Sequence, residues 1–384
     1  MMRKIAVITG IRADYGIIYP VIKEIQKHRD LKLELIVAGT HLSHEFGYTI
    51  KEIENDKFKV AAKVDMLLSD NTGARMGKSI GVGILGFTQT FEILKPDITL
   101  LIGDREEMLA AAVASLCMDI PVAHIHGGEI GTGGHIDESV RHAITKFAHI
   151  HFAVTKKSAE RINRLGEENW RVHFVGAPFM DNIKQKRFTG SNELKKKIDL
   201  DLSEPLIVVI QHPLTLESKN SKTHMQITME AVAHFRLPTI VIYPNADAGS
   251  QDIIQVIKQY ERYPYIKVFK NFTPRDYLGI LKIAGVVVGN SSSGIIETPA
   301  FGLPAVNIGI RQLGREMSEN IINVGYDKKE IENAIRQSLF NEAFRVKAKN
   351  CQNFYGTGGS SQKIVKILAD IILDSKLLHK KMTF

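Results

Sequence analysis

The sequence predicts an α/β protein built from two doubly wound, Rossmann-like domains. Its 384 residues are too many for one ordinary hydrophobic core and suit two domains. Short, continuous apolar runs alternate with helical patterns, as in parallel sheets that helices cover on both faces. The alternation breaks near Gly176-Ala177-Pro178 and then restarts, so we expect the two domains to meet there.

The first half of the chain contains six apolar runs and four helical patterns. The expected strands are Ile5–Thr9, Leu33–Val37, Ile98–Ile102, Pro121–Ile125, His149–Val154 and Val172–Val175. The expected helices are Gly16–Gln26, Gly81–Leu94, Glu106–Met118 and Asp137–Phe147.

The second half repeats the pattern. The expected strands are Leu206–Ile210, Thr239–Tyr243, Ile266–Phe269, Val286–Gly289 and Ala305–Ile308. We therefore assign residues 1–177 to an N-terminal domain and residues 178–364 to a C-terminal, nucleotide-binding domain. A Lys-rich amphipathic pattern from Gln362 to Lys381 predicts a terminal helix, and we expect residues 365–384 to pack back onto the first domain.

Composition narrows the class of partner and compartment. The net charge of +8 is spread along the chain, without interleaved aromatic residues, which favours a small anionic substrate over nucleic acid. The two cysteines lie far apart, and we expect Cys117 to be a packed thiol in a reducing compartment. No signal peptide and no apolar run of membrane-spanning length is evident, so a cytoplasmic protein without membrane contact is expected.

Polar residues that follow strands are the candidates for a site, because ligands of open parallel sheets bind beyond the carboxyl ends of the strands. The turn Gly289–Gly294 can aim backbone N–H groups and the hydroxyls of Ser291 and Ser292 at a phosphate. Glu297 can then face a neutral diol such as a ribose. The alternative is that this Gly-Ser cluster is only a turn.

Four residues after strands of the first half are further candidates. Arg12 can give a phosphate two parallel N–H bonds, or it is a surface arginine beside a turn. His41 can contact a ligand or be structural. Asp104 and Arg105 follow a strand as well, and Asp104 could instead cap a helix with Glu107 three residues on.

A group of carboxylates is the second strong feature. Glu129 follows a Gly-Gly bend, and Asp137 opens a helix on which Arg141, four residues later, can pair with it. With Asp104, these residues provide the acids and bases that proton transfer at a carbon atom requires. Two alternatives are a metal site of His124, His126 and Glu129, and a capping role for Asp137.

Residues after strands of the second half complete the candidates. His212 could hold a phosphate or act as an acid. Asn245 and Asp247 follow the next strand, and Arg311 brings a cation beside the serine turn.

Together these residues resemble the UDP-N-acetylglucosamine 2-epimerase family, most closely its hydrolysing branch, over essentially the whole chain. The motifs that carry the resemblance are Arg12-Ala13-Asp14-Tyr15, Gly103-Asp104-Arg105, Gly127-Gly128-Glu129, the segment Ile136–Lys146, Gln211-His212-Pro213, the segment Pro244–Ser250, Gly289-Asn290-Ser291-Ser292 and the segment Arg311–Glu316. The resemblance implies a GT-B arrangement of the two domains, with a nucleotide sugar in the cleft between them.

The resemblance also implies roles for individual residues. Acid and base functions fall on Asp104, Glu129 and Asp137. Contacts to the diphosphate and uridine fall on Arg12, Arg105, His212, Asn245, Ser291, Ser292, Glu297 and Arg311. It further implies a homodimer or homotetramer that needs no metal or redox cofactor and converts UDP-N-acetylglucosamine to N-acetylmannosamine and UDP for sialic acid synthesis.

One departure from the family pattern leaves the substrate open. The segment Ile130–Ile136 is longer than usual and borders the expected sugar site. A sibling group in this branch acts on GDP-N,N'-diacetylbacillosamine in legionaminic acid synthesis. Further alternatives are a non-hydrolysing epimerase, a GT-B glycosyltransferase and a non-catalytic nucleotide-sugar sensor.

Overall fold

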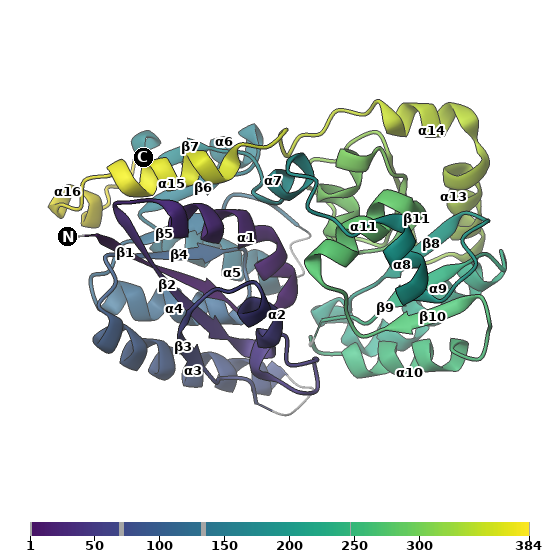
Figure 1. Ribbon diagram of the computed structural model, residues 1–384, viewed down its shortest axis with the longest axis horizontal. Coiled ribbons are helices and arrows are strands. Elements are labelled where there is room, and N and C mark those ends of the chain that lie inside the picture. The colour runs from purple at the N-terminus through teal and green to yellow at the C-terminus, as the bar shows by residue number, and fades with distance from the viewer. Residues whose placement is uncertain (1, 69–72, 132–135, 246, 384) are drawn as a thin grey trace. The chain divides into compact units, whose positions relative to one another are not determined.

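The computed structural model describes residues 2–68, 73–131, 136–245 and 247–383, and the chain divides into two compact units (Figure 1). The first unit comprises residues 1–130, 137–185 and 355–384. The second comprises residues 131–136 and 186–354. The expected α/β class is confirmed, because each unit contains one parallel sheet with helices packed against it.

The first unit is built on a seven-stranded parallel sheet of order β3-β2-β1-β4-β5-β6-β7. Its strands are β1 (Arg3–Thr9), β2 (Leu31–Ala38), β3 (Val60–Val64), β4 (Ile98–Ile102), β5 (Val122–Ile125), β6 (Ile150–Ala153) and β7 (Val172–Phe174). Its helices are α1 (Arg12–Lys27), α2 (Ile50–Asn55), α3 (Gly73–Leu94), α4 (Glu106–Cys117), α5 (Ile136–Phe147), α6 (Lys156–Arg164), α7 (Phe179–Lys184), α15 (Ser360–Asp370) and α16 (Ser375–Leu378), with 3₁₀ turns η1 (Gly39–Leu42) and η2 (Asn169–Arg171).

The second unit is built on a six-stranded parallel sheet of order β10-β9-β8-β11-β12-β13. Its strands are β8 (Leu206–Ile210), β9 (Thr239–Ile242), β10 (Ile266–Phe269), β11 (Ala284–Gly289), β12 (Ala305–Ile308) and β13 (Ile321–Val324). Its helices are α8 (Ser191–Ile198), α9 (Ser221–Ala233), α10 (Ser250–Tyr260), α11 (Pro274–Ile283), α12 (Ser293–Ile296), α13 (Lys328–Phe340) and α14 (Glu342–Lys349), with 3₁₀ turns η3 (Thr215–Asn220) and η4 (Thr298–Phe301).

In both sheets the central strands are buried apolar runs. All residues of β4, β5 and β8 are buried, since helices cover both faces of the sheet. The chain crosses from the middle of each sheet toward one edge and then toward the other. In such doubly wound sheets the carboxyl ends of the central strands form the usual ligand-binding edge.

The helix α7 belongs to the first unit, although the expected boundary after residue 177 precedes it. Its Asp181 is buried and accepts hydrogen bonds from the backbone N–H of Gly359 and from both the N–H (2.8 Å) and the hydroxyl of Ser361. Asp181 therefore caps the first turn of α15 and ties α7 to the returning chain.

The expected terminal helix is in fact two shorter helices. α15 ends at Asp370 and α16 begins at Ser375, so residues 371–374 separate them. The side chain of Asp374 accepts a hydrogen bond from Leu377 N–H (3.0 Å), so a new helix start interrupts the amphipathic pattern. Both helices pack on the first unit, where Arg3 donates to the carbonyls of Leu368 and Ala369.

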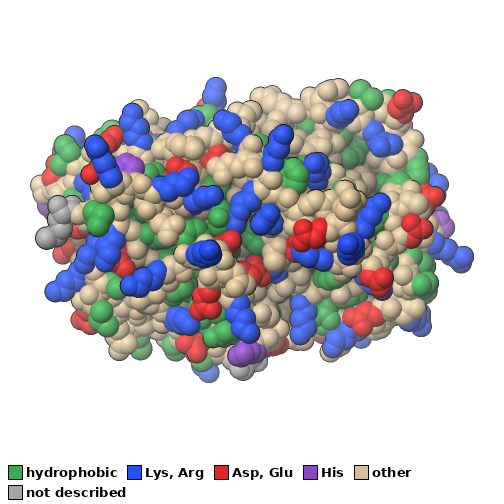
Figure 2. Space-filling model, in the orientation of Figure 1, with side chains coloured by type: hydrophobic (Ala, Val, Ile, Leu, Met, Phe, Trp, Pro, Cys, Tyr) green, Lys and Arg blue, Asp and Glu red, His purple; other side chains and the backbone are tan. Residues whose placement is uncertain are grey.

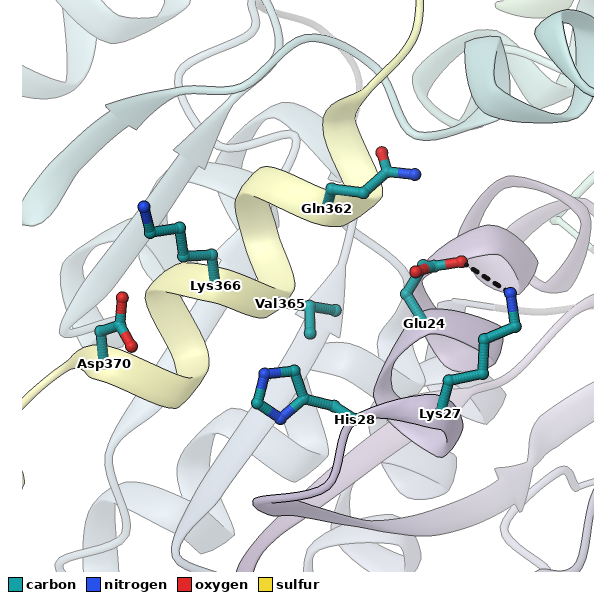
Figure 3. A pocket seen from close by; sticks show the side chains of 7 residues that line it. All are labelled: Glu24, Lys27, His28, Gln362, Val365, Lys366 and Asp370. Carbon is teal, nitrogen blue, oxygen red and sulfur yellow. Dashed lines mark hydrogen bonds and ion pairs between the residues drawn. The ribbon is translucent and has the colours of Figure 1, made fainter.

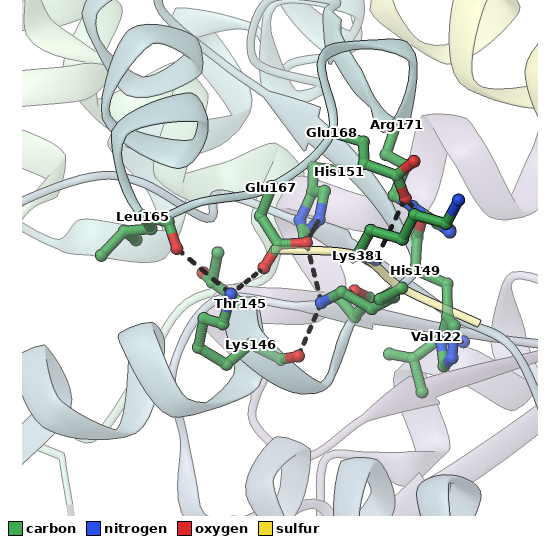
Figure 4. A network of polar contacts seen from close by, with 12 residues as sticks. Val122, Thr145, Lys146, His149, His151, Leu165, Glu167, Glu168, Arg171 and Lys381 are labelled. Carbon is green, nitrogen blue, oxygen red and sulfur yellow. Dashed lines mark hydrogen bonds and ion pairs between the residues drawn. The ribbon is translucent and has the colours of Figure 1, made fainter. Parts of the chain in front are cut away.

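A polar network holds the end of the chain against the first unit (Figure 4). The buried carboxylate of Glu167 accepts from Lys146 (2.5 Å), Lys380 (2.8 Å) and His151 (3.1 Å). Burial opposes its charge, but these three hydrogen bonds prevail and lower the pKa of Glu167 to about 2. Arg171 also donates to the carbonyl of Leu377 (2.7 Å).

Two surface features bear on the expectations from composition. Lys and Arg side chains are scattered among acidic ones over the face that Figure 2 shows, rather than gathered in one area. Cys117 is exposed at the end of α4, so the expectation that it is packed was wrong. Within the described residues, no helix combines the length and apolarity that crossing a bilayer requires.

Candidate active site

The candidate residues of the first unit lie beyond the carboxyl ends of β1, β2, β4 and β5. These strands are neighbours in the order β2-β1-β4-β5, so the residues that follow them share one edge of the sheet. They comprise Arg12, His41, Asp104, Arg105 and Glu129, and the start of α5 adds Asp137 and Arg141.

Arg141 connects the carboxylates of this edge. Its guanidinium forms an ion pair with Asp104, another with Glu138 (2.8 Å), and a hydrogen bond to the backbone carbonyl of Glu129 (3.1 Å). Burial opposes the charge of Arg141, but the charges of Asp104 and Glu129 raise its pKa above the ordinary value. Arg141 is therefore a fixed cation that holds the end of β4 and the Gly-Gly bend together.

Arg141 forms its ion pair with Asp104 rather than the expected pair with Asp137. The four-residue spacing places Asp137 and Arg141 on one helix face, but Arg141 turns toward the end of β4. Asp137 itself is buried in the first turn of α5, and its charge acts on Asp14 of the same unit.

Glu129 pairs with a histidine in a strained backbone conformation. The Glu129 carboxylate lies 3.1 Å from Nδ1 of His126, and both side chains are buried. His126 has φ +69°, which is uncommon for a residue with a side chain and is typical of functional turns. The pair can hold or pass a proton.

His124, two residues earlier, turns away from this pair. Its Nε2 donates to the carbonyl of Gly103 (2.7 Å), and burial lowers its pKa to about 3, so the ring is neutral. Among the described residues, no group of three or more His, Cys, Asp or Glu side chains is arranged to hold a metal ion. This disagrees with the alternative of a metal site at His124, His126 and Glu129.

The capping alternative for Asp104 is not what the structure shows. The helix α4 begins at Glu106, its N-cap residue is Arg105, and that residue makes no capping hydrogen bond with its side chain. Asp104 pairs with Arg141 instead.

Two buried acids at this edge were not predicted as site residues. Glu107 is 1% exposed, and neither of its carboxylate oxygens has a hydrogen-bond partner among the described residues. A Cβ atom at Gly39, whose φ is +58°, would lie 2.0 Å from one of these oxygens, so only glycine fits there. Burial and the neighbouring charge of Glu107 raise the pKa of Asp14 well above its ordinary value.

Arg12 and His41 both have partners within the protein. Arg12 forms an ion pair with Glu52 of α2. His41 is fully buried, with its two ring nitrogens 3.0 Å from the hydroxyl of Thr9 and 2.7 Å from that of Thr49. Burial, reinforced by the charge of Arg12, lowers the pKa of His41 to about 3. This arrangement favours the structural alternative for His41, while its role in binding stays a prediction.

The candidate residues of the second unit gather beyond β8, β9, β11 and β12. Asn290, which follows β11, is buried, and its side-chain amide forms hydrogen bonds with both the backbone N–H and the backbone carbonyl of His212. It accepts from the His212 N–H (2.7 Å) and donates to the His212 carbonyl (2.8 Å). The backbone N–H of Asn245 donates to Nδ1 of His212 (3.1 Å), which leaves the proton of the neutral ring on Nε2.

The serine turn begins at a glycine that no other residue could replace. Gly289 has φ +132°, and a Cβ there would lie 2.0 Å from the carbonyl oxygen of Ile210. Within the described residues, no hydrogen bond uses the backbone N–H groups of Ser291 or Ser292, so both remain available to an anion. Arg311 donates to the carbonyl of Asn290 (3.4 Å) and brings a cation to the same strand end.

Glu297 is linked to the serine turn through Ser293, which donates to its carboxylate. Tyr277 contacts the same serine hydroxyl. Burial raises the pKa of Glu297 to about 7, with the serine hydrogen bond acting in the opposite direction. Glu297 can therefore change its protonation state near neutral pH.

Two features near these residues could not be predicted from local sequence. Gln312 donates to the Asn290 carbonyl (2.9 Å), and Tyr326 stacks on His224 with ring centroids 3.5 Å apart.

Asp247, a predicted ligand, is buried beside the start of α10. Ala246 in its motif and residues 132–135 of the long segment lie outside the described residues.

A separate pocket of about 320 Å³ lies between the end of α1 and α15 (Figure 3). It is lined by Glu24, Lys27, His28, Gln362, Val365, Lys366 and Asp370. The end of α1 leads into the start of β2, which places this pocket at the amino end of the strands, away from the candidate residues.

Two Rossmann-like units, each with polar residues beyond the carboxyl ends of its central strands, define the class of doubly wound α/β proteins that bind ligands at those edges. A family model described as UDP-N-acetylglucosamine 2-epimerase matches residues 23–369, and the chain belongs to this family.

Relatives with assigned activities extend over nearly the whole chain. The UDP-N,N'-diacetylbacillosamine 2-epimerase (hydrolyzing) of Legionella pneumophila is 38% identical over 99% of both chains. The GDP/UDP-N,N'-diacetylbacillosamine 2-epimerase (hydrolyzing) of Campylobacter jejuni is 36% identical over 98% of both. The UDP-N-acetylglucosamine 2-epimerase of Neisseria meningitidis serogroup B is 33% identical over 88% of both.

A solved structure confirms the two-domain fold. The UDP-GlcNAc 2-epimerase from Neisseria meningitidis, crystallised with UDP-GlcNAc, matches with a TM-score of 0.80 at 18% identity. The match covers 95% of this chain and 99% of that one. The expected class, two Rossmann-like domains of GT-B type, is therefore confirmed.

Proposed function

We propose that this protein is a hydrolysing nucleotide-sugar 2-epimerase, which releases a free 2-epimerised 2-acetamido sugar and a nucleoside diphosphate. The observation that carries the proposal is the arrangement at the edge of the first sheet, where Arg141 holds Asp104 beside the Glu129 bend. The two relatives with identities of 38% and 36% are both named as hydrolysing epimerases, which supports the same branch.

The chemical problem is the proton at C2 of the sugar, which is not acidic in a neutral pyranose. If the bond from C1 to the diphosphate oxygen breaks, C1 becomes electron-poor and the C2 proton becomes acidic. Loss of that proton gives a glycal and the nucleoside diphosphate. Water then adds its oxygen to C1, and a proton returns to C2 from the opposite face, which inverts that centre.

In this scheme the acids of the first unit move the protons. Glu129 or Asp104 removes the C2 proton, and Asp137 takes part in its return. The contact between Glu129 and His126 provides a place for the proton to reside. Arg141 stabilises the carboxylate form of Asp104, which a base requires.

The residues of the second unit stabilise the leaving diphosphate. The free N–H groups of Ser291 and Ser292, the positive charge of Arg311 and the Nε2 proton of His212 suit the negative charge that develops when the C1–O bond breaks. Arg12 and Arg105 of the first unit stabilise the same negative charge. Glu297 accepts hydrogen bonds from the ribose hydroxyls. That these groups act on one substrate between the two domains is part of the proposal.

For the donor we favour UDP-N,N'-diacetylbacillosamine over UDP-N-acetylglucosamine. The relatives named for the diacetylated sugar are 38% and 36% identical, whereas the one named for UDP-N-acetylglucosamine is 33% identical. The motifs had favoured UDP-N-acetylglucosamine, with GDP-N,N'-diacetylbacillosamine rather than its UDP form as the alternative. The product would then enter legionaminic-type rather than sialic acid synthesis in the cytoplasm.

The proposal is tested by NMR of the purified protein with each UDP donor, and with the GDP donor, in deuterated water. We expect free sugar with deuterium at C2 and the nucleoside diphosphate, without any acceptor. Product lacking deuterium at C2 contradicts the elimination scheme. An epimerised sugar still attached to the nucleotide indicates the non-hydrolysing reaction, and dependence on an acceptor indicates a glycosyltransferase.

Asp137→Asn separates a catalytic from a structural role for this residue. We expect turnover to fall by roughly 100-fold or more, because a proton-transfer group is lost. UDP affinity should stay within a few-fold, as measured by calorimetry. Asp370→Asn, at an exposed acid of the same unit, is the matched control. Equal losses of turnover and affinity would support the capping role instead.

A further inference from the structure

Glu107 and Asp14 are two buried acids that the proposed reaction does not yet use. Glu107 lies in the first turn of α4, is 1% exposed, and has no hydrogen-bond partner for either carboxylate oxygen among the described residues. Asp14, in the first turn of α1, is 9% exposed, and its Oδ2 atom has no partner within the same part of the chain. Buried carboxylates without partners are rare, because burial penalises an unpaired charge, so this pair indicates a function.

The backbone around Glu107 leaves room for its carboxyl group. The side chain reaches from α4 to the residues that follow β1 and β2, where it lies against Gly10 and Gly39. A Cβ atom at Gly10 would lie 2.6 Å from the carboxyl carbon of Glu107, and one at Gly39 would lie 2.0 Å from a carboxylate oxygen. Packing against two glycines, rather than an ion pair, therefore fixes the position of this acid.

The surroundings of Asp14 favour its protonated form. Burial is the largest cause and the charge of Glu107 is the next, and together they raise the pKa of Asp14 well above its ordinary value. Asp104 and Asp137 act in the same direction, whereas Arg105 opposes them. Two carboxyl groups that share a buried place do not both ionise, so Asp14 and Glu107 hold one proton between them at neutral pH.

The proposed reaction needs an acid that carries a proton before the sugar reacts. The proton that returns to C2 arrives on the face opposite to the one that leaves, so the base that removed the first proton cannot deliver the second. Arg141 holds Asp104 ionised, and Glu129 lies beside His126, which suits both carboxylates to accept a proton. The pair of Asp14 and its buried neighbour stores a proton that can be given.

We propose that Asp14 supplies the proton that C2 of the product receives, and that Glu107 is the positioning residue that keeps this proton on Asp14. The inference rests on the proposed function and assigns its acid. Asp14 is the more exposed member of the pair, and its carboxyl group interacts electrostatically with Asp137. The proton therefore passes from Asp14 to the Asp137 carboxylate and from there to C2.

This transfer balances without any further reactant. The O–H bond of Asp14 breaks as Asp137 takes the proton. The double-bond electrons of the glycal then form the bond between C2 and the proton that Asp137 releases, and C1 takes the oxygen of water. That water loses one proton to solvent. Before the next turnover, Asp14 regains a proton from solvent, and the base releases to solvent the proton that it took from C2.

Asp14→Asn separates the return of the proton from the earlier breaking of the C1–O bond. With a heavy oxygen isotope at the bridging position of the donor, movement of the label into the diphosphate reports reversible elimination, and free sugar reports hydration of the glycal. We expect free sugar to form roughly 100-fold more slowly, because a general acid is lost, while label movement or release of the glycal stays within about tenfold of wild type. Asp370→Asn, at an exposed acid, should change neither rate.

Glu107→Gln tests the positioning role through the pH profile. An acid acts only while it is protonated, so the rate of free-sugar formation should fall as the pH rises through the pKa of Asp14. Glutamine removes the negative charge beside Asp14, which lowers the pKa of Asp14 and moves this fall to lower pH by roughly one unit. Glu54→Gln, at an exposed acid of α2, is the matched control and should leave the profile unchanged.

The outcomes distinguish this inference from the proposed function. A wild-type protein that releases neither free sugar nor nucleoside diphosphate from any of the donors overturns both. With an active wild type, equal losses of label movement and free sugar in Asp14→Asn, or no loss at all, overturn only the assignment of Asp14. An unchanged pH profile in Glu107→Gln overturns the role of Glu107, and this profile decides the inference if Asp14→Asn does not fold, as judged by circular dichroism.

Discussion

At the residue scale, side chains that lie far apart in the sequence determine the site. Asn290 was predicted only as part of the serine turn, yet its amide holds the backbone of His212, 78 residues earlier. An asparagine after a strand gives no local signal of such a partner. The same holds for Arg141, whose neighbour on its own helix was the expected partner but whose ion pair crosses to Asp104.

Glu297 provides a prediction at this scale. Burial raises its pKa to about 7, and the ionised carboxylate is a stronger acceptor for the ribose hydroxyls than the protonated acid. Nucleotide-sugar affinity should therefore increase with pH, by roughly tenfold between pH 6 and pH 8, because binding releases the proton. Calorimetry with a UDP-sugar in the Asp137→Asn background measures this without turnover, and the sugar diphosphate itself does not titrate in this range.

Glu297→Gln is the matched variant for that measurement. The glutamine keeps a hydrogen-bond acceptor but cannot titrate. The nucleotide-sugar affinity of this variant should therefore not show the rise between pH 6 and pH 8 that ionisation of Glu297 causes. If the pH profile of the Gln variant equals that of its parent, Glu297 does not contact the nucleotide.

At the element scale, the strands in the middle of each sheet were predicted, as were the edge strands β7 and β10, whereas the other edge strand of each sheet was missed. β3 and β13 were missed because most of their residues are partly exposed, which interrupts the continuous apolar run of a buried parallel strand. The terminal segment was predicted as one helix because its amphipathic pattern continues through residues 371–374. The cap at Asp374 shows that the segment forms two.

The attachment of α15 to α7 gives a prediction at this scale. Asp181→Ala removes the carboxylate that accepts from Gly359 and Ser361, and leaves buried donors without partners. The free energy of unfolding of the first unit should fall by about 1–3 kcal/mol. Urea unfolding followed by the fluorescence of Trp170, the only tryptophan of the chain, reports on this unit. Asp370→Ala, at the exposed end of α15, should change it little.

At the scale of the whole molecule, three buried histidines make the stability of the first unit sensitive to acid. Burial lowers the pKa of His41 and His124 to about 3 and that of His149 to about 4, and all three lie in the first unit. Each stays neutral in the folded protein and gains a proton on unfolding below its ordinary pKa. Their contribution to stability is therefore present above about pH 6.5 and is lost as the pH falls toward 4.

Acid should accordingly weaken the first unit. Each histidine lowers the free energy of unfolding by about 1.4 kcal/mol per pH unit below pH 6.5, whereas the raised pKa of Asp14 acts in the opposite direction. Between pH 7 and pH 5, the urea midpoint reported by Trp170 fluorescence should fall. The urea midpoint of the later part of the far-ultraviolet circular dichroism transition should fall by less. Coincident and pH-independent transitions would contradict this expectation.

By itself, the sequence determined the α/β class, the repetition of a Rossmann-like pattern and the edges at which polar residues gather. These depend on local periodicity and on residues that directly follow strands, both of which are present in the chain before it folds. Only the tertiary structure decided that Arg141 pairs with Asp104, that His41 is enclosed between two threonines and that Glu107 lies against Gly39. Ion pairs and burial depend on distances between elements far apart in the sequence, and no local spacing specifies them.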